Sequence, residues 1–305
     1  MKKTFKALIG LVALVMVLPK AMAITIDGDL TDWGVTFDEL RDGLNDSSIP
    51  GENGNVSAWL PNPGVRFVIE DNVDPKLGYA DAYATGVHIK GIGSSYSDYY
   101  EPLIDGQPQP IGRERFDMEA MYVTENEDFI YVAIVYSGDV DAIGDLALNL
   151  DGNMSTGDYG YEFGVRLYYP SNHPMRGTMV GNLTLYEIYD TSSPGSWREA
   201  LPHSEASPSR MNVWSLGSPV GHAVGFWRDS GIMDFGRKNY IIELAIPKVF
   251  VGMENKNLPE QPLPKKIHLT EYCGNDDIDI PIPEFGLLAI PIGLLFGMIY
   301  VARRK

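Results

Sequence analysis

The stretch YVTENEDFIYVAIV, residues 122–135, decides the fold. Its second half, Phe129–Val135, is an unbroken run of aromatic, β-branched and other apolar residues, the composition that favours a strand. The polar segment Glu-Asn-Glu-Asp at 125–128 separates this run from another apolar run and is typical of a turn. The stretch therefore predicts an antiparallel hairpin with strands at Phe116–Thr124 and Phe129–Ser137.

The same pattern continues outward and predicts an all-β domain. Segments rich in Val, Ile, Tyr and Phe alternate with Gly, Pro, Asn and Asp, and no long stretch keeps a helical period. Strands of this kind bury their apolar faces most simply in a β-sandwich of about a dozen strands. The other expected strands are Val65–Glu70, Gly86–Lys90, Asp145–Asn149, Tyr161–Tyr168, Val180–Tyr189, Asn239–Ile246 and Ile267–Tyr272.

Residues 1–23 have the features of a secretory signal peptide. Lysines precede an apolar stretch from Ala7 to Leu18, and small residues at Ala21 and Ala23 match the cleavage rule, so cleavage is expected after Ala23. An uncleaved N-terminal anchor is the alternative. The apolar stretch is short for a membrane span, which favours cleavage.

The C-terminus, residues 281–305, combines a short motif, an apolar run and a basic cluster. Pro283-Glu284-Phe285 precedes an uncharged run from Phe285 to Ala302, which as a helix covers roughly 27 Å and nearly spans a hydrocarbon core of about 30 Å. The final residues, 303–305, are Arg-Arg-Lys and are expected to stay in the cytoplasm. A transmembrane helix at 285–302 therefore places residues 24–280 outside the cell as an ectodomain.

This tail resembles the PEF-CTERM sorting signal of archaeal surface proteins. The motif Pro283-Glu284-Phe285, the apolar segment and the terminal basic residues occur in the same order as in that family. The resemblance implies recognition by a membrane-embedded, archaeosortase-like transpeptidase that cuts near the motif and transfers the protein to a surface anchor. A plain single-span anchor that is never cut is the alternative.

Composition limits the partners of the exported part. The chain has 24 Lys+Arg and 41 Asp+Glu; without the signal peptide and tail, 17 basic and 40 acidic residues remain, a net charge of −23. So acidic a surface argues against nucleic acid and attracts divalent cations. The single cysteine, Cys273, excludes an intrachain disulfide and is expected to be a buried thiol.

The mature N-terminus and several internal motifs resemble one group of exported proteins. Ile24–Trp33 reads ITIDGDLTDW, in which Asp-Gly turns the chain and Trp33 can return to cover a core. The opening is similar to family 9 carbohydrate-binding modules and related DOMON-like jelly rolls, and implies a jelly-roll-like sandwich more firmly than an activity. The other segments that carry the resemblance are Met118–Tyr122, Phe129–Val135, Gly144–Gly152, Tyr161–Gly164 and Cys273–Asp276.

The loop DGNMSTGDYGYE, residues 151–162, is the sharpest candidate for a metal site. Side-chain oxygens of Asp151, Asn153, Asp158 and Glu162 can gather around a hard cation, and three glycines permit tight turns. Calcium takes six to eight such oxygens, so we expect a structural calcium ion here. A metal-free hairpin turn rich in Asx residues is the alternative.

Tryptophans in loop-like sequence are the candidate ligand-binding residues. Sugars stack on exposed aromatic rings, and Trp59 and Trp197 lie in such segments. Trp33 and Trp227 are expected in the core instead. The sequence also carries four glycosylation sequons, which begin at Asn45, Asn55, Asn153 and Asn182.

Three functions are compatible with these features. The first is an exported cell-surface module that binds a glycan or another extracellular ligand, and the second is a structural or adhesive envelope component. A carbohydrate-active enzyme ranks last, because the sequence shows no nucleophile elbow or P-loop and paired carboxylates arise freely in so acidic a chain. We therefore expect no catalytic residues.

Overall fold

The computed structural model of the protein is all-β, as the sequence predicts, with one large antiparallel sheet. It describes residues 23–36, 58–70, 89–93, 95–99, 103–106, 110–111, 116–138, 141–167, 180–188, 196–212, 214–216, 218–234, 237–252 and 265–281. The helices in these ranges are short 3-10 turns, η1 (Leu30–Trp33), η4 (Ser204–Ala206) and η5 (Lys248–Val251).

Twelve strands form one antiparallel sheet. Its order is β14-β13-β6-β7-β8-β11-β12-β5-β4-β1-β2-β3, and a separate two-stranded sheet pairs β10 with β9. The strands are β1 (Arg66–Ile69), β2 (Ile89–Ile92), β3 (Ser95–Asp98), β4 (Met118–Glu125), β5 (Phe129–Tyr136), β6 (Leu146–Asn149), β7 (Phe163–Val165), β8 (Val180–Glu187), β9 (Trp197–Arg198), β10 (Arg210–Met211), β11 (Gly221–Asp234), β12 (Arg237–Pro247), β13 (Lys266–Thr270) and β14 (Asp277–Pro281).

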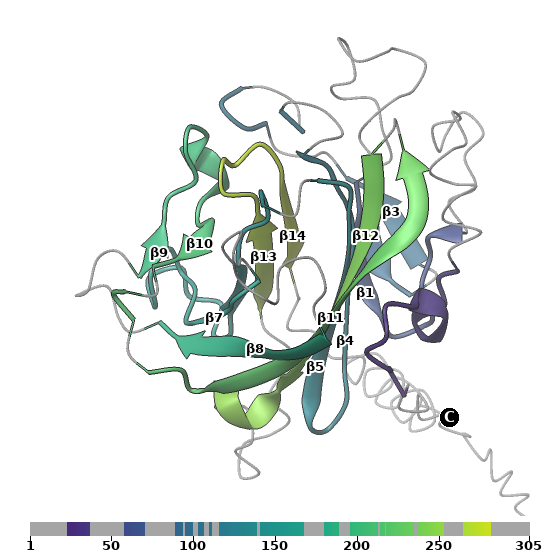
Figure 1. The fold of residues 1–305 in the computed structure, drawn as a ribbon, viewed down its shortest axis with the longest axis horizontal. Coiled ribbons are helices and arrows are strands. Elements are labelled where there is room, and N and C mark those ends of the chain that lie inside the picture. Colours follow the sequence, from purple (N-terminus) through teal and green to yellow (C-terminus); the bar gives the residue numbers. More distant parts are fainter. Residues whose placement is uncertain are drawn as a thin grey trace, which may run out of the picture.

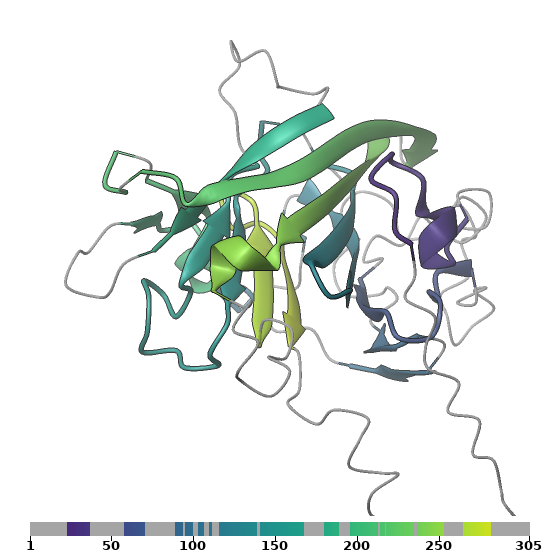
Figure 2. The same ribbon diagram turned by 90° about the horizontal axis from the view of Figure 1, so that it is seen from below.

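The large sheet bends back on itself, so that one continuous sheet makes a sandwich-like body. Strand β14, at one end of the sheet order, contacts β1 and β4 near the other end. Figures 1 and 2 show β13 and β14 standing opposite the long strands β4, β5, β11 and β12. The expected two layers are therefore halves of a single sheet.

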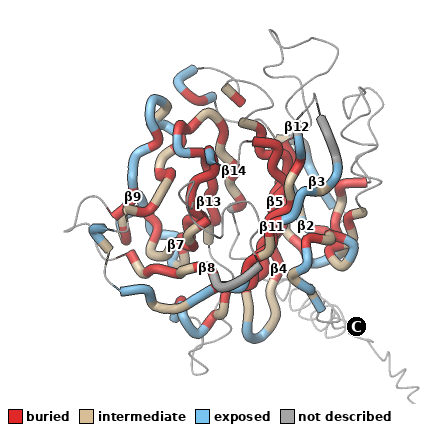
Figure 3. Tube along the Cα trace, in the orientation of Figure 1, coloured by how far each residue is buried: buried red, intermediate tan, exposed pale blue. Residues whose placement is uncertain are grey.

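Buried residues concentrate on the strands of the large sheet (Figure 3). The buried apolar residues form three clusters. The largest fills the space between the two halves and includes Met121, Ile134, Leu148 and Leu269. A second cluster lies on the opposite face of β1, β4, β5 and β12, where the N-terminal segment covers it with residues such as Trp33. The smallest lies against β9 and β10 and consists of Ala147, Tyr161, Tyr186, Ile188, Trp197 and Met211.

The hairpin predicted at residues 122–135 is present in the structure. Strand β4 pairs with β5 from Met118 opposite Tyr136 to Glu125 opposite Ile130. The Asn126 side-chain oxygen accepts hydrogen bonds from the backbone N–H groups of Asp128 and Phe129, and so closes the turn. Both strands are almost completely buried because each face supports a different apolar cluster.

Strands β3, β9, β10, β11 and β14 were not among the predicted strands. Strand β11 is the longest in the sheet, but glycines and charged residues interrupt its apolar pattern. A Cβ at Gly225 would lie 2.3 Å from Leu183 Cδ1 on β8, so the glycine allows that leucine to pack closely against β11. Such a close approach between strands depends on a tertiary neighbour that the local sequence does not reveal.

A buried carboxylate fastens the N-terminal segment to the sheet. Glu243 on β12 is fully buried and accepts hydrogen bonds from the backbone N–H groups of Asp27 and Gly28. Its other oxygen accepts a 2.7 Å hydrogen bond from Trp33 Nε1. The turn at Asp27-Gly28 and the return of Trp33, both expected from the sequence, are thus held by one side chain.

Glu243 gives the protein a specific pH dependence. Burial raises the pKa of Glu243 to about 7, although its three N–H donors act in the opposite direction. The folded state therefore binds a proton that the unfolded chain has released, and this contribution to stability is present at pH 4.5 and lost as the pH rises to about 7. We predict that the difference in unfolding free energy between wild type and Glu243→Gln falls by about 1–3 kcal/mol over this range.

Urea denaturation at a series of pH values measures this difference. Glu127→Gln, on the exposed turn after β4, is the matched control and should follow the wild-type profile. Parallel pH profiles of wild type and Glu243→Gln would contradict the assignment.

Candidate functional site

The loop between β6 and β7 is built from tight turns. Gly152, Gly157 and Gly160 have positive φ angles, as does Tyr159 with a φ of 58°. Asp151 and Asn153 each accept a hydrogen bond from the backbone N–H two residues later, at 2.7 Å and 3.0 Å. These local bonds fold the segment back on itself and bring its oxygens together.

Four oxygens surround the hydroxyl of Thr156. Asp151 Oδ1 and Oδ2 lie 3.0 Å and 2.9 Å from Thr156 Oγ1, and the Asn153 carbonyl oxygen lies 2.7 Å away. Glu162 Oε1 approaches the same hydroxyl at 2.7 Å. A hydroxyl has a single proton to donate, so it satisfies one of these acceptors at a time.

The oxygens of this cluster gather around one position. The four distances to Thr156 Oγ1, 2.7–3.0 Å, are those of hydrogen bonds. A calcium ion would require its ligand oxygens at about 2.3–2.6 Å. Carboxylate and carbonyl oxygens, both present here, are the ligands that calcium prefers.

Glu162 is fixed in place by the sheet. Its second oxygen, Oε2, accepts a 2.7 Å hydrogen bond from the backbone N–H of Leu150, across the mouth of the loop. Burial, together with the charge of Asp151, raises the pKa of Glu162. A divalent cation would offset both effects, because it favours the charged form of each carboxylate.

The structure brings together some of the four residues predicted to bind calcium. Asp151 and Glu162 lie in the cluster, whereas Asn153 directs its backbone carbonyl into it and its side-chain oxygen accepts from Ser155 N. Asp158 instead accepts a 2.9 Å hydrogen bond from the backbone N–H of Trp197. The central residue, Thr156, was missed; a hydroxyl between two acidic residues in a glycine-rich loop was the available signal.

The two tryptophans predicted to bind a ligand are buried. Trp59 and Trp197 are each 3% exposed, in the second and the smallest apolar cluster respectively. Trp197 packs against Gly164, where a Cβ would lie 2.8 Å from the indole ring. In this conformation neither ring offers a face to a sugar. Trp214, in contrast, is 89% exposed, while Trp33 and Trp227 are buried as predicted.

The motif Cys273–Asp276 has a structural place. The Asp276 carboxylate accepts a 2.6 Å hydrogen bond from the backbone N–H of Met118, and so connects the segment between β13 and β14 to β4. Cys273 is 7% exposed, as expected, and burial next to Glu271 raises the pKa of its thiol to about 11. The motif therefore has a structural role, because it connects the two halves of the sheet.

Several predicted features lie outside the described residues. They include the cleavage position Ala21, the sorting motif at Pro283, Glu284 and Phe285, and the sequons at Asn45 and Asn55. Ala23 is the first described residue, Asn153 is exposed, and Asn182 lies on β8 opposite Val224. Among the described residues, no helix has the length and apolar character needed to span a bilayer.

Comparison with known proteins adds no relative. No protein-family profile, characterised protein or solved structure matches this chain.

Proposed function

We propose that this chain is an exported, non-enzymatic surface protein whose β-domain binds calcium and serves as a component of the cell envelope. The observation that carries the proposal is the group of oxygens from Asp151, Asn153 and Glu162 around Thr156 Oγ1. Calcium would tie the ends of β6 and β7 together in a domain that has a single cysteine and no disulfide.

Export and anchoring are proposed from the sequence of the two ends. Residues 1–23 read as a signal peptide, and residues 281–305 resemble a PEF-CTERM tail with a transmembrane helix at 285–302. Strand β14 ends at Pro281, two residues before the motif. The folded domain would therefore be displayed close to the membrane, and an archaeosortase-like enzyme would process the tail.

Glycan binding is the second candidate function, and Trp214 favours it. Its side chain is 89% exposed in the segment after β10, so its ring faces are available for stacking on a sugar. This candidate keeps the resemblance to carbohydrate-binding jelly rolls but transfers the stacking role from Trp59 and Trp197 to Trp214.

The calcium proposal makes a prediction about stability. An ion that binds only the folded state at a hundredfold excess over its dissociation constant stabilises it by about 2.7 kcal/mol, or roughly 5–10 °C in a protein of this size. Wild-type protein should melt higher in calcium than in chelator by this amount. Thr156→Val should remove most of the difference, because it replaces the central oxygen with a methyl group of similar shape.

Asp158→Asn is the matched control for this experiment. It changes a carboxylate of the same loop that accepts from Trp197 N, so it should lower the melting temperature equally in both buffers and keep the calcium-dependent difference. Identical melting curves of the wild type in calcium and chelator would rule out the calcium site. If Asp158→Asn loses the calcium-dependent difference in melting temperature and Thr156→Val keeps it, the ligands would be those predicted from the sequence, with Asp158 among them.

The glycan candidate predicts a specific role for one ring. On a glycan array, wild-type protein should bind a restricted set of sugars, Trp214→Ala should lose them, and Trp214→Phe should keep part of the signal because an aromatic face remains. A wild-type array without selective binding, or unchanged binding by Trp214→Ala, would leave the structural envelope role as the better proposal.

The tail predicts chemical recognition as well as hydrophobic insertion. Glu284→Ala leaves the apolar run intact, so a simple anchor should tolerate it, whereas a transpeptidase that reads the motif should leave a longer, unprocessed form in the membrane. Intact mass measured on protein recovered from cells distinguishes the two forms. Wild-type protein that still ends at Lys305, with equal display of the variant, would identify an ordinary single-span protein.

A further inference from the structure

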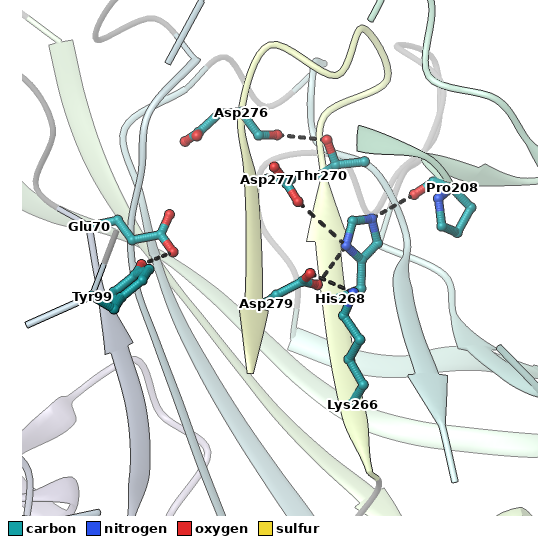
Figure 4. A network of polar contacts seen from close by, with 9 residues as sticks. All are labelled: Glu70, Tyr99, Pro208, Lys266, His268, Thr270, Asp276, Asp277 and Asp279. Atoms are coloured by element: carbon teal, nitrogen blue, oxygen red, sulfur yellow. Dashed lines mark hydrogen bonds and ion pairs between the residues drawn. The ribbon is translucent and has the colours of Figure 1, made fainter. Parts of the chain in front are cut away.

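A second polar cluster lies on the face of β13 and β14 that turns away from the largest apolar cluster. His268 on β13 pairs in register with Asp279 on β14, and Asp277 is two residues along the same strand. Figure 4 shows the imidazole ring directed at both carboxylates, with Pro208 on its other side. These residues supply no ligand to the proposed calcium site, although Tyr161 of the loop at residues 151–162 contacts His268.

The three side chains present ligand atoms at metal-binding distance. His268 Nδ1 lies 2.8 Å from Asp279 Oδ1 and 3.9 Å from Asp277 Oδ2, and the three atoms lie within 4.8 Å of one another. A tetrahedral ion with ligands at about 2.0–2.2 Å requires ligand atoms roughly 3.3–3.6 Å apart. The two distances from His268 Nδ1, 2.8 Å and 3.9 Å, lie on either side of this requirement.

The other ring nitrogen, His268 Nε2, makes the kind of hydrogen bond that is common in metal-binding histidines. His268 Nε2 lies 3.1 Å from the carbonyl oxygen of Pro208, which accepts the Nε2–H hydrogen bond. A histidine that binds a metal through one nitrogen commonly donates the other N–H to a carbonyl or carboxylate, which fixes the tautomer and the ring orientation. The Tyr161 ring, with its centroid 5.5 Å from that of the imidazole, restricts the ring further.

We propose that His268, Asp277 and Asp279 form a binding site for a divalent transition-metal ion such as Zn²⁺, coordinated by His268 Nδ1 and one oxygen of each aspartate. Imidazole nitrogen together with carboxylate oxygen suits zinc and its neighbours, whereas calcium prefers ligand sets made of oxygen alone. The chain would then carry two chemically distinct ion sites.

Lys266 competes with the metal for this site. Its ammonium group lies 2.6 Å from Asp279 Oδ2, and its side chain is 31% exposed. Without a metal, the ammonium group of Lys266 lies beside Asp279, and the two ring nitrogens of His268 face oxygens of Asp279 and Pro208. An ion bound at Nδ1 would require that nitrogen without its proton, and Lys266 would have to turn away from Asp279.

The ion would join three segments of the chain. His268 and the aspartates belong to neighbouring strands at one end of the sheet, and the Nε2–H bond reaches Pro208, two residues before β10. Three protein ligands leave a fourth position for water. The Asp279 side chain is 34% exposed, so solvent reaches the cluster.

Zinc binding by the purified full-length protein tests the site. Equilibrium dialysis against Zn²⁺ gives affinity and stoichiometry, and Co²⁺ in its place reports tetrahedral geometry through its visible d–d absorption. Removing one ligand in Asp279→Asn or His268→Gln should weaken Zn²⁺ binding by at least the 10–100-fold known for changes to outer-shell partners. Lys266→Met should strengthen binding, because it removes the competing ammonium.

His203→Gln is the matched control. His203 Nδ1 lies 2.7 Å from the carboxylate of Asp105. This histidine pairs with one carboxylate and not with two, so His203→Gln should leave the Zn²⁺ affinity unchanged. Equal Zn²⁺ binding by wild type and Asp279→Asn would overturn the proposal. So would the absence of binding in both wild type and Lys266→Met, and the cluster would then be an ion-pair network that only stabilises the strand pair.

Discussion

Buried carboxylates that accept backbone N–H groups connect the segments of this protein. Glu243 holds the N-terminal turn to β12, and Asp276 holds the segment between β13 and β14 to β4. Asp145 accepts 2.8 Å hydrogen bonds from both Leu167 N and Met211 N, and so joins the end of β7 to β10. In each case a side chain, rather than a neighbouring strand, satisfies the backbone N–H groups.

Burial of so many acids constrains the surrounding structure. A buried carboxylate is costly unless hydrogen bonds or opposite charges compensate, and removal of one partner leaves the full desolvation cost of the group. The three N–H donors of Glu243 offset only part of the cost of its burial, because the pKa of Glu243 is still raised to about 7. Where two carboxylates lie close together, each disfavours the charged form of the other, and a nearby positive charge opposes this effect. Lys266 lies 2.6 Å from Asp279 in this way, and the proposed calcium ion would act similarly on Asp151 and Glu162.

Local sequence was sufficient where local contacts decide the structure. The hairpin at 122–135 was predictable because both strands are apolar on both faces and Asn126 closes the turn within four residues. The burial of Trp33 followed from the turn at Asp27-Gly28. Strand β11 was not predictable, because Gly225 is explained only by Leu183 on β8. Trp197 was predicted to be exposed because prolines and serines surround it in the sequence. In the structure it packs in the smallest apolar cluster with Met211 of β10, and its backbone N–H donates to Asp158.

The candidate ion sites lie where apolar packing contributes least. The N-terminal segment covers an extensive apolar cluster, so Glu243 only has to fix its position. The small β9–β10 sheet rests on a cluster of six residues, and burial of that size contributes much less at about 25 cal/mol per Å². Polar links therefore hold this part of the molecule: Asp158 to Trp197 N, Asp145 to Met211 N, and His268 to the Pro208 carbonyl. Two of these links begin within or beside a candidate ion site. Ion binding would therefore add stability where the hydrophobic contribution is smallest, as a disulfide does in small secreted domains.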